Sequence, residues 1–164
     1  MAALAVVRRL PARRFVCNAA RTALAYAPGV RLDPHSFCDS DQVETAAIEL
    51  DARVDFARRR VDGKVVLRLR ASSARERGGP LDLDTRGLAI AAVRDGDGRP
   101  LAFELGSPDP ILGARLRVQL APRSEAVEID YHTASDASAL QWLEPAQTRG
   151  ARHPYLFSQC QAIH

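Results

Sequence analysis

Lysine is almost absent from this sequence, because Lys64 is the only lysine among 23 basic residues. A coding bias toward GC-rich codons explains so extreme a ratio without any functional demand, which weakens every argument built on arginine alone. Aromatic residues make up only 5% of the chain, so a core must consist mainly of leucine, valine, isoleucine and alanine. The remaining composition, 46% hydrophobic and 26% charged, is that of an ordinary globular protein.

Several kinds of segment and site are also missing. No apolar run approaches the roughly 18 residues that a membrane-spanning helix requires, so we expect no membrane partner. The three cysteines, Cys17, Cys38 and Cys160, form no C-x-x-C pair and are too irregular for a disulfide framework. The sequence contains no H-E-x-x-H and no glycine-rich phosphate loop. We therefore expect this chain to hold no metal and no other cofactor by itself.

Acidic residues are missing from residues 1–32, which contain six arginines. Since the whole chain has a net charge of +3, the rest carries −3, and an acidic body argues against nucleic acid as a partner. An arginine-rich, acid-free leader is typical of a transit peptide, which would direct the protein to a mitochondrion or plastid. Serine, usual in such peptides, is absent before Ser36. A transit peptide or disordered leader, the coding bias and a misassigned start codon stay open as explanations.

The body, residues 33–164, shows the pattern of an all-β domain. From residue 45 to residue 56, apolar and charged side chains alternate strictly, which predicts a half-buried strand. Asp62-Gly63 predicts the following hairpin turn, and the Asp-Gly pairs near residue 96 predict another turn rather than a calcium loop. We expect seven short antiparallel strands and no amphipathic helix. They cover residues 45–56, 64–71, 81–83, 88–93, 101–105, 116–120 and 127–131.

The carboxyl-terminal stretch from Ala134 onward loses this alternation and combines aromatic with amide side chains. Its amides are Gln141, Gln147, Gln159 and Gln161, and its aromatic residues are Trp142, Tyr155 and Phe157. Such a mixture on loops is typical of a binding site. The alternative is that four apolar residues anchor a long loop in the core, namely Trp142, Leu143, Leu156 and Phe157. His132 falls on a polar strand position, which predicts a solvated side chain.

This stretch, "ALQWLEPAQTRGARHPYLFSQCQAIH", resembles the segment that precedes the catalytic domain in the leukotriene A4 hydrolase and aminopeptidase B type of zinc aminopeptidase. "DPHSF" and "LDLDTRGLAI" upstream are also similar to that family, so the resemblance covers residues 33–164. It implies a saddle of mostly antiparallel β-sheet, incomplete at its carboxyl end. It also implies a Q-x-Q-A turn that holds the amino end of a peptide substrate. By position, these substrate-binding residues are Gln159, Gln161 and Ala162.

The same resemblance implies what this chain does not carry. The zinc ligands, the catalytic glutamate, the G-x-M-E-N strand and the proton-donating tyrosine of the family have no match here, so we predict no catalytic residues and no activity for these 164 residues alone. We expect a substrate-anchoring portion of a cytosolic metallo-aminopeptidase, whose partners are a peptide and its own downstream catalytic domain. Whether the whole protein also hydrolyses an epoxide lipid stays open.

Two alternatives to this interpretation remain. A free-standing β-sandwich binding module without catalysis fits the strand pattern equally well, because a fold does not determine a function. A truncated or split gene model would produce the same chain. A severed domain should expose apolar surface and an unpaired strand edge, and should aggregate, whereas residues 33–164 of an independent module should melt cooperatively.

Overall fold

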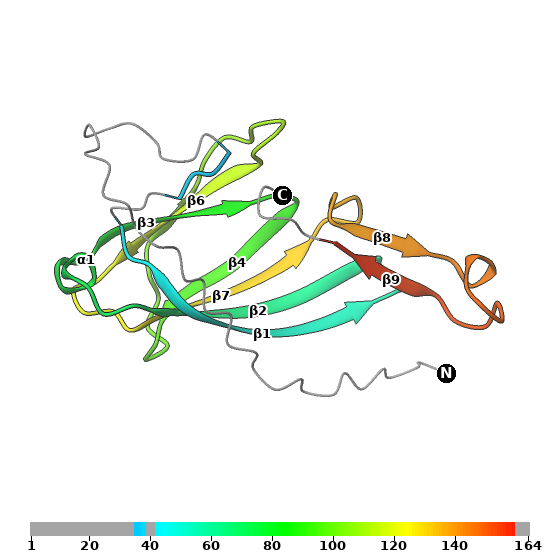
Figure 1. The fold of residues 1–164 in the computed structure, drawn as a ribbon, viewed down its shortest axis with the longest axis horizontal. Helices are drawn as coiled ribbons and strands as arrows, with labels where there is room; N and C mark the ends of the chain where they lie inside the picture. The colour runs from blue at the N-terminus through cyan, green and yellow to red at the C-terminus, as the bar shows by residue number, and fades with distance from the viewer. Residues whose placement is uncertain (1–34, 39–41, 160–164) are drawn as a thin grey trace, which may run out of the picture.

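The structure is a computed structural model that describes residues 35–38 and 42–159. Its strands are β1 (Thr45–Asp55), β2 (Arg60–Leu69), β3 (Gly79–Thr85), β4 (Leu88–Asp95), β5 (Phe103–Leu105), β6 (Ala114–Leu120), β7 (Ala126–Thr133), β8 (Leu140–Leu143) and β9 (Tyr155–Ser158). A short helix α1 (Ser73–Arg77) and a 3-10 turn η1 (Pro145–Gln147) complete the elements (Figure 1). All strand pairs are antiparallel, which confirms the predicted all-β class.

The strands form three sheets. One has four strands in the order β1-β2-β7-β4, one has three strands in the order β3-β6-β5, and β8 pairs with β9. The first two sheets enclose the core, because its buried residues come from both. They are Val43, Leu67, Leu69, Leu81, Val93, Leu116, Val118, Leu120, Val127 and Ile129. As predicted from the scarcity of aromatic residues, this core consists of leucine, valine and isoleucine.

The strand predicted for residues 45–56 is confirmed as β1, but the expected burial of its apolar face is wrong. Ile48 and Leu50 are 64% and 63% exposed. Within the described residues β1 is an edge strand that pairs with β2, and Ile48 lies beside the buried Leu67 of that strand. Alternation therefore identifies the two faces of β1, but the core residues of the four-stranded sheet come from β2, β4 and β7.

The predicted turn at Asp62-Gly63 is also wrong. The chain turns at residues 56–59, and Asp62 and Gly63 lie inside β2, opposite Arg53 and Ala52. A β-carbon on Gly63 would stand 2.3 Å from a ring carbon of Tyr131 on the neighbouring strand. Gly63 therefore leaves room for the Tyr131 ring to lie close to the β2 backbone, and it does not form a turn.

The loop predicted around residues 72–80 contains α1. Ser72 caps this helix, since its hydroxyl oxygen accepts a hydrogen bond from the Arg75 backbone N–H at 3.2 Å. Gly78 ends it with a φ of 72°. The turn predicted at the Asp-Gly pairs is confirmed, because the Gly98 N–H donates to the Asp95 carbonyl at 3.0 Å.

Two aspartates of β3 attach the segment that leads into the fold. Asp84 accepts hydrogen bonds from the Ser36 hydroxyl at 2.6 Å and from the Phe37 backbone N–H at 2.7 Å. Asp82, only 4% exposed, accepts two hydrogen bonds of 2.7 Å from Arg117 and one of 3.0 Å from Gln42. These bonds hold the lead-in segment against the three-stranded sheet. In the part of the chain described here, no helix has the length and apolar character needed to cross a membrane.

Candidate functional site

Residues 140–158, here called the arm, contain β8, η1 and β9 and project beyond the four-stranded sheet, at the right of Figure 1. The sequence prediction did not include β8 and β9, because apolar and polar side chains do not alternate regularly from Ala134 onward. Gln141 pairs with Phe157, Trp142 with Leu156, and Leu143 with Tyr155. Since side chains alternate between the two faces of a strand, this register separates the arm into two faces.

One face, here called the open face, carries Gln141, Leu143, Tyr155 and Phe157. Tyr155 is 56% exposed and Phe157 is 45% exposed. The interpretation that residues such as Phe157 anchor a long loop in the core is therefore wrong, because none of the four proposed anchors belongs to the buried core. An exposed aromatic pair flanked by an amide is a surface suited to binding.

The opposite face carries Trp142 and Leu156 and is attached to the rest of the domain. The Trp142 ring meets the Phe56 ring edge-on, with centroids 5.8 Å apart and planes at 87°. Arg59 of the turn between β1 and β2 forms an ion pair with Glu144, directly after β8. Tyr155 and Phe157 of the open face are thus exposed among the described residues, while the other face contacts the domain.

Gln159 lies at the exit from β9. Its backbone N–H donates to the Ala139 carbonyl at 3.3 Å, so the antiparallel pairing continues one residue past Ser158. By alternation its side chain belongs to the same face as Tyr155 and Phe157, and the residue is exposed. Gln161 and Ala162 lie outside the described residues. The substrate-binding role of all three residues stays a prediction.

Gln147 has a local structural role. The side-chain oxygen of Gln147 accepts a hydrogen bond from the Glu144 backbone N–H at 2.9 Å. The backbone N–H of Gln147 donates a hydrogen bond to the Glu144 carbonyl, also at 2.9 Å. These bonds close the turn after β8 and place Glu144 beside Arg59. Gln141, Gln147 and Gln159 are all exposed, and of these Gln147 is held by its hydrogen bond to the Glu144 backbone.

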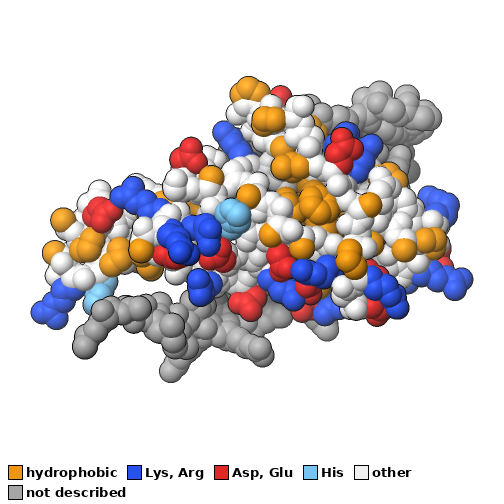
Figure 2. Space-filling view, turned by 180° about the vertical axis from the view of Figure 1, so that it is seen from behind, with side chains coloured by type: hydrophobic (Ala, Val, Ile, Leu, Met, Phe, Trp, Pro, Cys, Tyr) orange, Lys and Arg blue, Asp and Glu red, His pale blue; other side chains and the backbone are white. Residues whose placement is uncertain are grey.

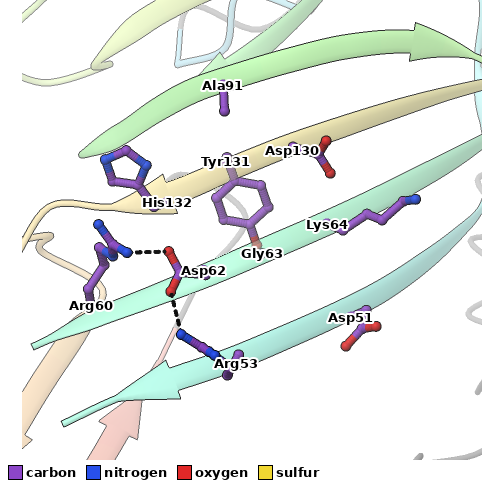
Figure 3. Close-up of a pocket in the computed structure, with 10 residues that line it drawn as sticks. All are labelled: Asp51, Arg53, Arg60, Asp62, Gly63, Lys64, Ala91, Asp130, Tyr131 and His132. Atoms are coloured by element: carbon purple, nitrogen blue, oxygen red, sulfur yellow. Dashed lines mark ion pairs between the residues drawn. The ribbon is translucent and has the colours of Figure 1, made fainter.

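A groove of about 650 Å³ crosses the polar face of the four-stranded sheet (Figure 3). Asp62 pairs with Arg60 at 2.9 Å and lies 3.9 Å from Arg53, while His132 borders the same end of the groove. Sequence reasoning assigned His132 to a solvated face but did not predict this groove, which depends on the register of three strands. The groove is lined by Asp51, Arg53, Arg60, Asp62, Gly63, Lys64, Ala91, Asp130, Tyr131 and His132.

The charges of this face compensate one another. Lys64 lies 2.8 Å from Glu128, and Arg94 donates a hydrogen bond to Asp130. Figure 2 shows basic and acidic side chains intermixed on this side of the molecule rather than gathered by sign. A mixed face provides no basic patch for nucleic acid. Among the described residues, no group of three or more histidine, cysteine, aspartate or glutamate side chains is gathered so as to hold a metal ion.

Comparison with known proteins identifies relatives of this fold and sequence. No protein-family model matches the chain. It is 35% identical over 137 residues to leucine aminopeptidase 2 of Phaeosphaeria nodorum and 37% identical over 137 residues to leukotriene A-4 hydrolase of Xenopus laevis. Each match covers 80% of this chain and 22% of the relative. Leucine aminopeptidase 2 of Yarrowia lipolytica is 34% identical over 162 residues, or 95% of this chain and 24% of that protein.

Solved structures agree with the sequence comparison. Yeast LTA4 hydrolase in complex with bestatin matches with a TM-score of 0.72 and 27% identity, over 87% of this chain and 22% of that one. Native leukotriene A4 hydrolase from Saccharomyces cerevisiae matches with a TM-score of 0.71 at the same identity. The chain therefore spans about 22% of the length of these relatives, and the matched part is their amino-terminal portion.

Proposed function

We propose that this chain, which matches in sequence and fold the amino-terminal portion of the leukotriene A4 hydrolase type of aminopeptidase, holds the amino end of a peptide substrate. The observation that carries this proposal is the position of Gln159 on the open face of the arm. It follows Tyr155 and Phe157 on that face, and it immediately precedes the rest of the Q-x-Q-A segment. The whole protein would then remove residues from the amino ends of peptides.

The chemistry of the amide side chain supports this role. A substrate ammonium group donates hydrogen bonds and accepts none, and an amide oxygen accepts them without adding a full charge. An exopeptidase needs such a contact to measure its cleavage site from the amino end. The carbonyl oxygen of the Gln161 side chain is the proposed primary acceptor, with Gln159 in support and Ala162 lining the turn.

The described residues do not fit a zinc site, since no suitable set of donor side chains is gathered there. Zinc, when bound to an aminopeptidase of this type, activates the attacking water and polarises the peptide carbonyl. The proposed contribution of this domain is consequently limited to binding and orienting the peptide. The residues that hold zinc would come from a catalytic domain, which is the proposed partner of the open face.

The experiment is a kinetic comparison of variants in the intact protein that carries this domain. Replacing Gln161 or Gln159 by alanine should raise KM for short peptides about tenfold or more, which is the loss of a hydrogen bond to a charged group. Gln119→Ala is the control, because Gln119 is an exposed amide on β6, outside the arm. Peptide kinetics that are unchanged in both glutamine variants would remove this turn from the substrate site.

The location of the protein is a separate proposal. The resemblance favours the cytosol, without a membrane or nucleic acid partner, while the composition of residues 1–32 favours a mitochondrion or plastid. A fluorescent protein fused behind residues 1–40 distinguishes the two. Import into an organelle would establish a transit peptide, and a diffuse cytosolic signal would exclude one.

A further inference from the structure

The arm has little support of its own. Its two strands pair with one another, and within the described residues no ladder connects them to the two larger sheets. An isolated two-stranded hairpin is marginally stable in water, so its orientation depends on side-chain contacts with the domain. If Gln159 is to hold a ligand in a defined place, those contacts must fix the arm.

Two side-chain pairs provide this attachment, and both involve the turn between β1 and β2. Phe56, where that turn begins, meets Trp142 edge-on at 5.8 Å. Arg59, where it ends, forms an ion pair with Glu144. Arg59 has a φ of 49°, a left-handed backbone conformation that is uncommon outside glycine.

A surface cavity of about 240 Å³ lies at the junction between the turn and the arm. Because this junction is open to solvent and has no strand pairing across it in the described part of the chain, each of the two side-chain pairs contributes to holding the arm. The cavity is lined by Phe56, Ala57, Arg59, Trp142, Leu143, Glu144, Pro145 and Pro154.

We infer that Phe56 and Arg59 are positioning residues, which hold the arm through Trp142 and Glu144 so that Gln159 faces the substrate. This inference rests on the proposed function of Gln159. Trp142 and Gln159 occupy opposite faces of the arm, so contacts that fix Trp142 leave the exposed Gln159 side chain accessible to a ligand. An arm that detaches for part of the time lowers the population competent to bind, and the apparent affinity falls by the same fraction.

The test uses the full 164-residue chain and its single tryptophan, Trp142. The indole nitrogen is buried, so quenching of its fluorescence by acrylamide reports whether the arm is attached. Arg59→Gln and Glu144→Gln should each raise the quenching constant and weaken binding of the tripeptide Leu-Gly-Gly two- to fivefold, the range expected for an exposed ion pair. Phe56→Leu should have a similar effect through loss of the aromatic contact.

Three controls separate attachment from general damage. Arg58→Gln changes the same turn, but Arg58 lies 3.7 Å from Asp55 and does not line the junction cavity, so it should alter neither readout. Arg59→Lys keeps the charge and should retain most of the affinity. The double variant Arg59→Gln with Glu144→Gln should be no worse than either single variant, because both remove the same ion pair.

The outcomes distinguish this inference from the proposed function. If Arg59→Gln, Glu144→Gln and Phe56→Leu leave quenching and tripeptide affinity unchanged while Gln159→Ala weakens binding, the positioning inference fails and the proposed function stands. If Gln159→Ala and Gln161→Ala both leave the affinity unchanged, the proposed function fails whatever the junction variants do. If the junction variants both weaken tripeptide binding and raise the acrylamide quenching constant of Trp142, the inference is supported.

Discussion

The ring of Tyr131 lies over Gly63, its partner in the pairing of β7 with β2, so closely that a β-carbon on Gly63 would stand 2.3 Å from a ring carbon. The contact explains why the Asp62-Gly63 pair, a strong turn signal in the sequence, lies inside a strand. It also joins two central strands of the sheet whose polar face forms the groove of Figure 3.

Replacing Gly63 by alanine should accordingly destabilise the fold. Displacing the Tyr131 ring is an overpacking change, and we expect a loss of about 2 kcal/mol in the free energy of unfolding. Urea titration measures it. Gly106→Ala is the control, because its nearest atom would be at 3.5 Å, an ordinary contact, and it should change stability by less than about 0.5 kcal/mol. A loss that persists in full when Tyr131 is replaced by leucine would exclude the ring as the cause.

The contacts of Asp82 predict a pH dependence of stability. Hydrogen bonds from Arg117, more than any other contact, hold the pKa of the Asp82 carboxyl below its usual range, and Gln42 adds to the effect. Because the folded-state pKa is lower than the unfolded value of about 3.9, the contribution is present above that pH and is lost as the pH falls through the lowered pKa.

Asp82→Asn should therefore cost about 3 kcal/mol at neutral pH, the loss expected on breaking a buried ion pair, and less in acid. Thermal melts between pH 2 and pH 7 test this (a range chosen to bracket the value of about 3.9). Asp97→Asn is the comparison, since that side chain is 69% exposed and should matter little. Equal losses for Asp82→Asn at both ends of the range would show that its charge is irrelevant.

The exposed apolar residues of β1 predict a tendency of the domain to aggregate. Leu50 is 63% exposed on an edge strand, so Leu50→Thr should lower light scattering at high concentration and change the free energy of unfolding by less than about 0.5 kcal/mol. Leu67→Thr is the matched variant on the neighbouring strand, where the side chain is 7% exposed, and it should cost about 3 kcal/mol. A comparable loss of stability for both would show that Leu50 is buried in solution.

The match to only the amino-terminal portion of these relatives gives another prediction, because the zinc ligands that the resemblance implies have no match in this sequence. The 164-residue chain should not hydrolyse leucine p-nitroanilide above background, and a chelator should change neither this rate nor its melting curve. Chelator-sensitive cleavage by a preparation of these residues alone would contradict the assignment of this domain to binding only.

Much of the fold was predictable because the relevant signals are local. Alternation located β1, β2, β6 and β7, and the Asp-Gly pairs located the turn after β4. The short strands β3 and β5 were also predicted, whereas the strands of the arm, which lack regular alternation, and the five-residue helix α1 were not. The turn at residues 56–59 was also not predicted. It places Arg59 in a left-handed backbone conformation, and arginine at that position is not a turn signal.

For the candidate site, too, some features could be predicted from the sequence and others only from the structure. The roles of Gln159, Gln161 and Ala162 came from a resemblance, and no local pattern predicted them. The register of the arm then placed Gln159 on the open face. The contact of Phe56 with Trp142 joins residues far apart in the sequence, so no local sequence pattern predicts that these two rings meet. Exposure of Ile48 and Leu50 likewise depends on which strands another sheet covers.

The most direct test compares the affinity of the 164-residue chain for a Leu-Gly-Gly tripeptide with a free amino group and for its N-acetylated form, by calorimetry. If the glutamines of the Q-x-Q-A segment hold the ammonium group, the free peptide should bind at least about tenfold more tightly. Gln159→Ala and Gln161→Ala should each reduce this preference, while Gln119→Ala, which changes an exposed amide outside the arm, should retain it. Equal affinity for the free and acetylated peptides would contradict the account.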